Sequence, residues 1–373
     1  MQSTQWVVLG GLALGIVFGA LGQWSRFCVR GAIADWVEAR QPARLSSWLI
    51  ALATAAIGTQ LLVQFNLFDI SRTNALNERF VWLSYLVGGA LFGYGMILAR
   101  GCPQRSLVKA GSGDMRAVVT LLVAAITAAM TLRGLFAEAR VQGLESKAVA
   151  LGMPQDGGSL LAAATDIAAG PLRWLIIGGF CVAVVWWLRR NRGTMNVSHW
   201  LGGALIGLLV PAAWYLTGHI GFAAEHPETL EAAWLGTQTN RPEALSFTAP
   251  LANTLDLLML WSDKNTVATF GVMLVVGVLL GSVLSALLRR DFRLENFQSP
   301  GELVNHLIGG TLMGFGGVTA MGCSIGQGLT GLSTLSAGAA LATAGIVAGA
   351  WAALRVQLRR SQARPARRGV ATA

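Results

Sequence analysis

One segment of this chain occurs twice, as LVGGALFGYGMILARGC at residues 86–102 and as LIGGTLMGFGGVTAMGC at residues 307–323. The two copies are 221 residues apart, and 9 of their 17 positions are identical. Both are apolar and rich in glycine, and both end in Gly-Cys, at Cys102 and at Cys323. A membrane-length segment that recurs in two halves and ends in a thiol indicates a duplicated transporter-like core, whose working site lies where the helices break.

The composition assigns the chain to the membrane proteins. It is 54% hydrophobic and 12% charged, whereas a soluble domain carries about a quarter charged residues. Several apolar windows of about 20 residues predict an all-α polytopic protein, a single membrane transport domain over residues 1–373 with the lipid bilayer as its surroundings. The net charge of +10 is typical of cytoplasmic loops in such a protein, so no nucleic-acid partner is expected.

The apolar windows predict nine spans, in a 4+1+4 arrangement. Equivalent spans are five apart, an odd number, so the two repeats must be inverted relative to each other. We assign residues 1–135 to the first repeat, 136–197 to a linker with one span, 198–356 to the second repeat and 357–373 to a basic cytoplasmic tail. The predicted spans are Trp6–Gln23, Trp48–Phe65, Phe80–Ala99, Arg116–Leu135, Leu172–Leu188, Trp200–Phe222, Asn265–Leu288, Gly301–Thr319 and Leu335–Val356.

The distribution of Lys and Arg predicts the orientation. Loops on the side of the N-terminus hold 8 of these residues and loops on the other side hold 20, which together make the 28 of the chain. Because basic loops stay in the cytoplasm, the N-terminus is expected in the periplasm and the C-terminus in the cytoplasm. Two short segments, Arg26–Arg40 and Ser246–Trp261, fit re-entrant half-helices at corresponding points of the repeats, a conformation tolerated where it lines a cavity.

The residues around the first repeated thiol suit an anion. Pro103 follows Cys102 and cannot continue the preceding helix, and the cations Arg100, Arg105 and Lys109 lie nearby. The new helix that begins here directs amide hydrogens at any anion held in front of it. The second copy offers hydroxyls and the amide of Gln327 but no charge. The alternative interpretation is that the glycines only let helices pack, as GxxxG sequences do.

A third thiol, Cys28, lies beside Arg26 at the break after the first span, and Thr248 holds the equivalent position in the second repeat. Three thiols and one hydroxyl therefore occupy the four break points of the two repeats, which indicates a common role. A thiol is a weak, soft donor that suits a sulfur acceptor. Cys181 lies mid-helix and is interpreted as a small buried hydrophobe. The cysteine spacing predicts neither a metal site nor a disulfide, and neither a cofactor nor ATP hydrolysis is expected.

The patterns FCxRGA, GxGxxxARGCPxRxLVKxGxG and GxGxxxAxGCSxGQGLTGxS, which occur in this order, resemble the YeeE/YedE family, whose sulphur-transport domain takes up thiosulfate in bacteria. The resemblance implies an inner-membrane thiosulfate importer, not an enzyme, with nine spans and re-entrant loops that meet in an hourglass-shaped centre. It also implies that Cys28, Cys102 and Cys323 line the path and pass thiosulfate through transient S–H···S hydrogen bonds. The chain lacks the fused TusA-like sulfur carrier of some relatives, so such a carrier would be a separate cytoplasmic partner.

Two other functions remain open at this point. The same fold could transport another sulfur or selenium anion, or a membrane thiol enzyme could transfer sulfane sulfur. The enzyme is disfavoured because none of the four histidines lies near a cysteine in the sequence. A hydrogen-bond relay for a dianion needs neutral thiols, whereas thiolates would favour a persulfide route. Inverted repeats further predict that Cys28, Cys102 and Cys323 converge, with Cys102 and Cys323 related by a pseudo-two-fold axis in the membrane plane.

Overall fold

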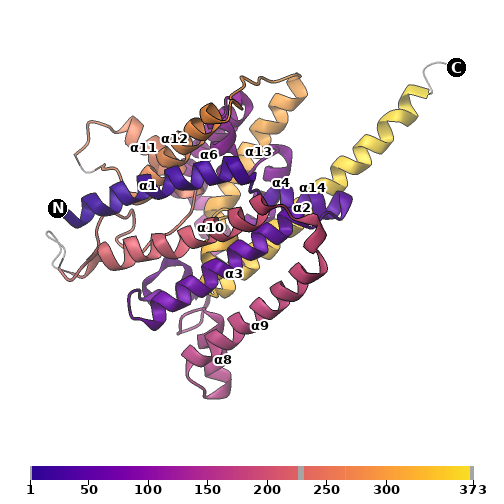
Figure 1. Ribbon diagram of the computed structural model, residues 1–373. Helices are drawn as coiled ribbons and strands as arrows, with labels where there is room; N and C mark the ends of the chain where they lie inside the picture. The colour runs from indigo at the N-terminus through magenta and orange to yellow at the C-terminus, as the bar shows by residue number, and fades with distance from the viewer. Residues whose placement is uncertain (1, 226–230, 265, 370–373) are drawn as a thin grey trace.

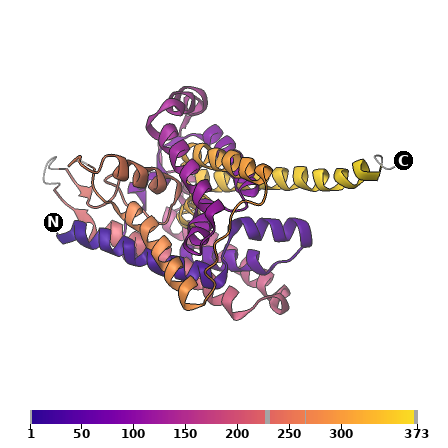
Figure 2. The ribbon, with the colours of Figure 1, turned by 90° about the horizontal axis from the view of Figure 1, so that it is seen from above.

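The computed structural model describes residues 2–225, 231–264 and 266–369. Within this part of the chain, each of the nine predicted spans falls on a helix of at least 17 residues. These long helices are α1 (Gln2–Ser25), α3 (Ala43–Gln64), α4 (Trp82–Leu98), α6 (Met115–Arg133), α9 (Ala169–Arg190), α10 (Val197–Tyr215), α12 (Phe270–Leu288), α13 (Pro300–Thr319) and α14 (Ala337–Gly369). The two termini lie at opposite ends of the molecule (Figures 1 and 2), as an odd number of crossings requires.

Shorter elements connect the long helices. The short helices are α2 (Val29–Ala39), α5 (Pro103–Gly111), α7 (Leu135–Glu138), α8 (Gly157–Thr165) and α11 (Thr248–Met259). Helical turns are η1 (Ile70–Arg72), η2 (Asn74–Leu76), η3 (Ala139–Leu144), η4 (Glu145–Lys147), η5 (Arg192–Thr194), η6 (Leu216–Ile220) and η7 (Gly326–Gly331). Two antiparallel strand pairs complete the fold, β1 (Arg79–Phe80) with β2 (Val149–Ala150) and β3 (Phe222–Ala223) with β4 (Ala233–Trp234).

The membrane-spanning character follows from length and apolarity. In the described residues, eight of the helices are long and apolar enough to cross a bilayer. The remaining long helix, α13, has 20 residues but begins with the polar side chains of Glu302, Asn305 and His306, which lower its mean hydropathy. His306 is buried there against Thr120 of α6, with 2.7 Å between Nδ1 and Oγ1. The predicted all-α polytopic fold is confirmed.

The packing of the helices shows that the repeats are inverted. A Cβ at Gly88 of α4 would touch Ala320 at the end of α13, whereas one at Gly95, later in α4, would touch Gly309 near the middle of α13. The two equivalent helices therefore run antiparallel. Other contacts are exchanged between the repeats: α1 packs on α12 as α10 packs on α3, and α4 packs on α14 as α13 packs on α6.

The repeated glycines permit the closest of these approaches. A Cβ at Gly314 of α13 would lie 2.5 Å from the carbonyl oxygen of Ala124 in α6, closer than a methyl group can approach. Its equivalent Gly93 in α4 is pressed in the same way against the backbone of Ile346 in α14. The packing role of the GxxxG glycines and the special role of the breaks are therefore compatible, because they concern different residues.

The remaining predicted boundaries shift only slightly. The two predicted half-helices are α2 and α11, both short. α2 follows α1 directly, whereas η6, β3 and β4 lie between α10 and α11. The seventh predicted span began at Asn265, which lies outside the described residues, and α12 starts at Phe270. The linker contains more structure than its single predicted span, since α7 and α8 precede α9. Residues 357–369 of the predicted tail continue α14, and residues 370–373 lie outside the described part.

Candidate transport site

The first repeated thiol lies at the gap between α4 and α5. After the end of α4 at Leu98, Arg100 takes a left-handed conformation with φ of 53°, and the amide of Gly101 donates to the Met96 carbonyl at 3.0 Å. This closes the helix end in the way left-handed C-caps do. Cys102 is then the N-cap of α5, with Pro103 in the first turn, and its side chain is fully buried.

The second repeated thiol has the same local structure. Met321 is left-handed with φ of 57°, and the amide of Gly322 donates to the Gly317 carbonyl at 2.8 Å. Cys323 follows, fully buried, and its sulfur accepts a hydrogen bond of 3.3 Å from the amide of Gly326 at the start of η7. The repeated Gly-Cys sequence thus specifies a repeated break, and in each copy a buried thiol lies at the start of the next turn.

The third thiol and its counterpart lie at the breaks before α2 and α11. Arg26 is left-handed with φ of 52°, and Cys28 caps α2 by accepting a hydrogen bond of 3.2 Å from the Gly31 amide. Thr248 is the first residue of α11, buried, and it lies against Gly317 of α13. The two positions correspond to within one residue of the helix start.

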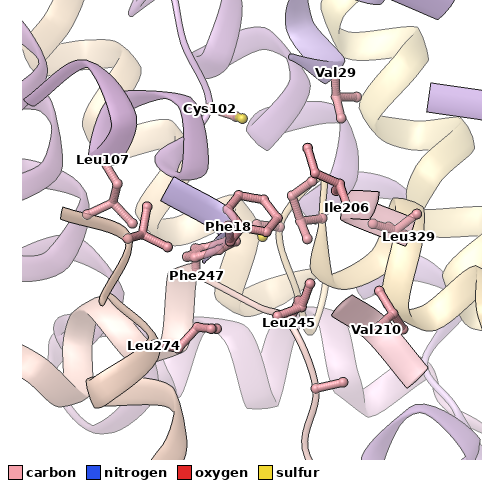
Figure 3. Close-up of a cluster of buried hydrophobic side chains, with 14 of the residues drawn as sticks. Phe18, Val29, Cys102, Leu107, Ile206, Val210, Leu245, Phe247, Leu274 and Leu329 are labelled. Carbon is pink, nitrogen blue, oxygen red and sulfur yellow. The ribbon is translucent and has the colours of Figure 1, made fainter. Parts of the chain in front are cut away.

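The structure brings the three thiols together. The Cys102 sulfur lies close enough to Cys28 and Cys323 to interact electrostatically with both, and Ser324 is beside it. Cys102 and Cys323 belong to one buried cluster, which also contains Phe18 and Phe247. Figure 3 shows Cys102 at the margin of this cluster, and the two phenylalanine rings have centroids 5.4 Å apart. Aromatic and aliphatic side chains therefore surround Cys102 and Cys323, whereas Cys28 is partly exposed.

Cys181 lies apart from this cluster. It is a partly exposed residue of α9, the linking helix, which packs on α3 at the edge of the molecule (Figure 1). Its neighbours on α9 include exposed apolar side chains such as Val182 and Trp186. This placement agrees with its interpretation as an apolar residue in a peripheral helix, except that it is less buried than expected.

Two cavities open at opposite ends of α12. The first, which we call the basic cavity, has a volume of 510 Å³. Its charged lining residues are Arg26, Arg44, Arg105, Lys109, Asp114, Arg116, Arg289, Asp291, Arg293 and Glu295. The second, which we call the Glu243 cavity, has a volume of 280 Å³, and its ionisable lining residues are Tyr85, Arg133 and Glu243. Neither lining, as described, contains a cysteine, and Cys102 and Cys323 are fully buried, whereas Cys28 is partly exposed.

Each cavity borders the breaks of one repeat. Arg26 and Arg105, which flank Cys28 and Cys102, line the basic cavity, and Arg105 Nη1 donates to the Gly22 carbonyl at 3.3 Å. Lys109 also lines it, and its Nζ donates to the Arg100 carbonyl at 3.2 Å. The two cavities therefore border the breaks of different repeats, and an hourglass-shaped path between them stays a prediction.

The remaining predicted site residues divide between the second cavity and the surface. Gln327, just after Cys323, lines the Glu243 cavity and donates from Nε2 to the Ala320 carbonyl at 2.6 Å. The Arg100 side chain is 62% exposed and pairs with Glu302 at 3.2 Å. Arg100 lines neither cavity as described. The sequence could not show that Arg100 pairs with Glu302, 202 residues later in the chain.

Sequence reasoning named Thr248 but missed two polar residues beside the thiols, Gln104 and Ser324. In the described structure, Gln104 Nε2, Ser324 Oγ and Thr248 Oγ1 are buried without a hydrogen-bond partner. Gln104 also touches the first thiol, because its Oε1 lies 3.8 Å from the Cys102 sulfur. Buried polar atoms are almost always satisfied, so unused donors around three thiols suit an absent acceptor. For Gln104 and Ser324, the position within two residues of a repeated cysteine was the available signal.

Ion pairs and hydrogen bonds join the segments that line the entrance of the basic cavity. Burial raises the pKa of Asp114, but the hydrogen bonds from Arg116 outweigh it and hold the pKa below its usual range. Arg116 also pairs with Glu295 and, at 3.4 Å, with Glu302. The loop after α12 is attached here as well, since the Met115 amide donates to the Glu295 carbonyl at 2.9 Å. The entrance of the basic cavity is therefore formed by the start of α6 and the loop after α12, which are far apart in the sequence.

Inverted membrane-spanning repeats, broken helices at the centre and two facing cavities define a multi-pass membrane transport protein. Comparison with known families agrees with this. The sulphur transport family matches residues 24–352, so the chain belongs to that family.

Two relatives are similar over most of their length. A protein named thiosulfate transporter TsuA from Escherichia coli (strain K12) is 26% identical over 344 residues, which cover 87% of each chain. A protein of the same name from Spirochaeta thermophila is 23% identical over 354 residues, 94% of this chain and 99% of the relative.

Proposed function

We propose that this protein imports thiosulfate across the bacterial inner membrane, passing the anion along a central path by hydrogen bonds to Cys28, Cys102 and Cys323. The N-terminus is periplasmic and the C-terminus cytoplasmic, so the basic cavity faces the cytoplasm and the Glu243 cavity the periplasm. The excess of Lys and Arg on one side supports this orientation. The two thiosulfate transporters to which the chain is similar support the substrate.

One observation carries this proposal: three thiols from separate breaks lie near one another, two of them fully buried, and residues of the same breaks line two cavities. Packing alone would require small apolar residues there, not sulfur in each of three positions. Thiosulfate has a terminal sulfur and three oxygens on a second sulfur. Neutral thiols donate weak hydrogen bonds to the soft terminal sulfur. None of the three thiols therefore binds the anion tightly enough to stop its transport.

The polar donors near the thiols match the other end of the anion. Gln104 Nε2, Ser324 Oγ and Thr248 Oγ1 have no partner in the described structure and are suited to donate to sulfonate oxygens. Such hydrogen bonds to a charged acceptor contribute about 1.5–3 kcal/mol each. Beyond the thiols, Arg105 and Lys109 line the basic cavity and attract the anion toward the cytoplasm. The separate TusA-like sulfur carrier would meet the protein at this basic face.

Transport of doubly labelled thiosulfate into a strain without other uptake routes tests the function. Accumulation of intact thiosulfate that depends on this protein is the expected result. Release of sulfite into the medium, with sulfane sulfur retained on the protein, would instead identify a sulfur-transferring enzyme. Uptake of selenate or sulfate in preference to thiosulfate would overturn the substrate assignment. Cys181→Ala is the control variant, because Cys181 lies on the peripheral helix α9.

A further inference from the structure

Glu243 is a carboxyl group inside a cavity through which an anion must pass. It lies in the loop between β4 and α11 and is mostly buried. Its side chain lines the Glu243 cavity together with Ser246, Gln327 and Thr330, which belong to or adjoin the breaks of the second repeat. None of the sequence motifs points to this residue. It is nevertheless the sole acidic side chain in the described lining of that cavity.

An ionised Glu243 would repel a dianion that enters the cavity, because little water is present to screen the two charges. The cavity offers one cation in return, Arg133 of α6. That cation is already engaged, since Arg133 pairs with Asp256 and donates from Nη2 to Asn253 Oδ1 at 3.0 Å. The only other ionisable group of the described lining is the phenol of Tyr85 in α4. No described side chain therefore compensates a carboxylate at position 243.

The surroundings of Glu243 hold it in place but leave one oxygen available. Its Oε1 accepts hydrogen bonds from the Gln238 amide at 2.9 Å, the Thr239 amide at 3.2 Å and the Thr239 hydroxyl at 3.3 Å. Its Oε2 lies near Gly271 of α12, which has no side chain to bond with.

The neighbouring turn η6 contributes no charge to the carboxyl. Its Thr217 bonds the backbone of Glu243, from Oγ1 to the carbonyl at 2.6 Å. The titratable residue of the same turn, His219, stacks on Tyr215. On the loop of Glu243 itself, Arg241 is exposed and lines a different cavity. Burial raises the pKa of Glu243 to about 7, although the hydrogen bonds to Oε1 lower it.

We propose that Glu243 is a substrate-binding residue that admits the anion only in its protonated form, in which the Oε2 hydroxyl donates a hydrogen bond to an oxygen of the anion. The proposal rests on the proposed function and adds to it a residue and a condition for binding. Protonation removes the repulsive charge and supplies a donor at the same atom. Uptake then falls as the pH outside rises. A group that is half protonated near neutrality changes its protonated fraction about ten-fold between one pH unit below and one above that point.

Uptake of labelled thiosulfate into proteoliposomes, with the inner pH fixed and the outer pH varied from about 6 to 8, tests this. We expect the initial rate of the wild type at low substrate to fall about ten-fold over this range. Glu243→Gln should hold the high rate throughout, because an amide donates a hydrogen bond, carries no charge and can accept from the Thr239 amide. Glu78→Gln, at an exposed position, should keep the wild-type profile. The same pH profile in wild type and Glu243→Gln would overturn the proposal.

A second variant separates the carboxyl from general effects of the mutation. Thr239→Val removes the hydroxyl that donates to Oε1, and this loss destabilises the ionised form. The midpoint of the pH profile should therefore move to higher pH than in the wild type. An unchanged or lower midpoint in Thr239→Val would contradict the assignment of the profile to Glu243.

Infrared difference spectroscopy on purified protein makes the test independent of transport. Titration from low to high pH should remove a carboxylic-acid band near neutral pH in the wild type, and Glu243→Gln should lack this change. If the band titrates but thiosulfate is not transported, the proposed function fails while the titration stands. If thiosulfate is transported but no carboxyl of residue 243 titrates between pH 6 and 8, the inference fails while the function stands.

Discussion

Cys102→Ala separates a role in transport from a role in packing. The Cys102 side chain is fully buried, and its weak contact is with Gln104 Oε1 at 3.8 Å. Replacing the thiol by hydrogen on the same carbon leaves a cavity of about one sulfur atom, which we expect to lower the free energy of unfolding by about 1 kcal/mol. A membrane protein with ordinary stability stays folded after such a loss.

The expected loss of transport is much larger than the loss of folded protein. A hydrogen bond to a charged partner contributes about 1.5–3 kcal/mol, and about 1.4 kcal/mol corresponds to a factor of ten. Removing one of three thiol stations should therefore lower the initial uptake rate by roughly 10- to 100-fold. Cys28→Ala and Cys323→Ala should behave similarly, except that each also removes an acceptor for a backbone amide, of Gly31 and of Gly326.

The assay is uptake of labelled thiosulfate at low concentration, normalised to the amount of folded protein found by size exclusion in detergent. Cys181→Ala, which changes a partly exposed residue of α9, should retain more than half of the wild-type rate. Normal uptake by Cys102→Ala at normal yield would refute the thiol relay. Loss of yield in proportion to loss of uptake would show that the thiol only packs.

Three further predictions concern charge, donors and helix packing. Arg105→Ala should lower uptake about ten-fold with normal yield, whereas Arg100→Ala, at an exposed side chain paired with Glu302, should change it less than two-fold. Gln104→Leu should raise the KM for thiosulfate about ten-fold in the same assay, because it removes an unused buried donor. Gly314→Val should lower the melting temperature in detergent by several degrees, because its Cβ would lie 2.5 Å from a carbonyl oxygen, whereas Gly170→Val, in open space, should not.

The parts of the structure that the sequence predicted are those determined by local physics. Membrane helices must be about 20 apolar residues long, so nine spans could be counted. Pro103 marks the start of a new helix, because proline suits the first turn of a helix and cannot continue the preceding one. Since α4 and α13 contain the same motif, their antiparallel packing followed from the count of spans between them.

The parts that could not be predicted depend on contacts between distant segments. Nothing local to Arg100 shows that its side chain is largely exposed and pairs with Glu302 while Arg105, five residues later, lines the basic cavity. The pairing of Phe18 with Phe247 joins two repeats, and their separation of more than 200 residues carries no periodic signal. Glu243 lies in a loop of ordinary acidic composition, and only the folded chain shows that it is buried in a cavity.

The cations of the basic cavity cannot by themselves drive net transport of an anion. Bringing a dianion into a cell with a negative interior costs about 2.3 kcal/mol per charge for each 100 mV of membrane potential, so roughly 4.6 kcal/mol for thiosulfate. The cations of the basic cavity lower the energy of the anion while it is bound there, but they are present before and after each transfer. Fixed charges therefore change the rate in both directions and cannot supply net free energy. Under the proposed function, net import would have to be driven by consumption of thiosulfate in the cytoplasm, or by cations that enter with it and cancel its charge.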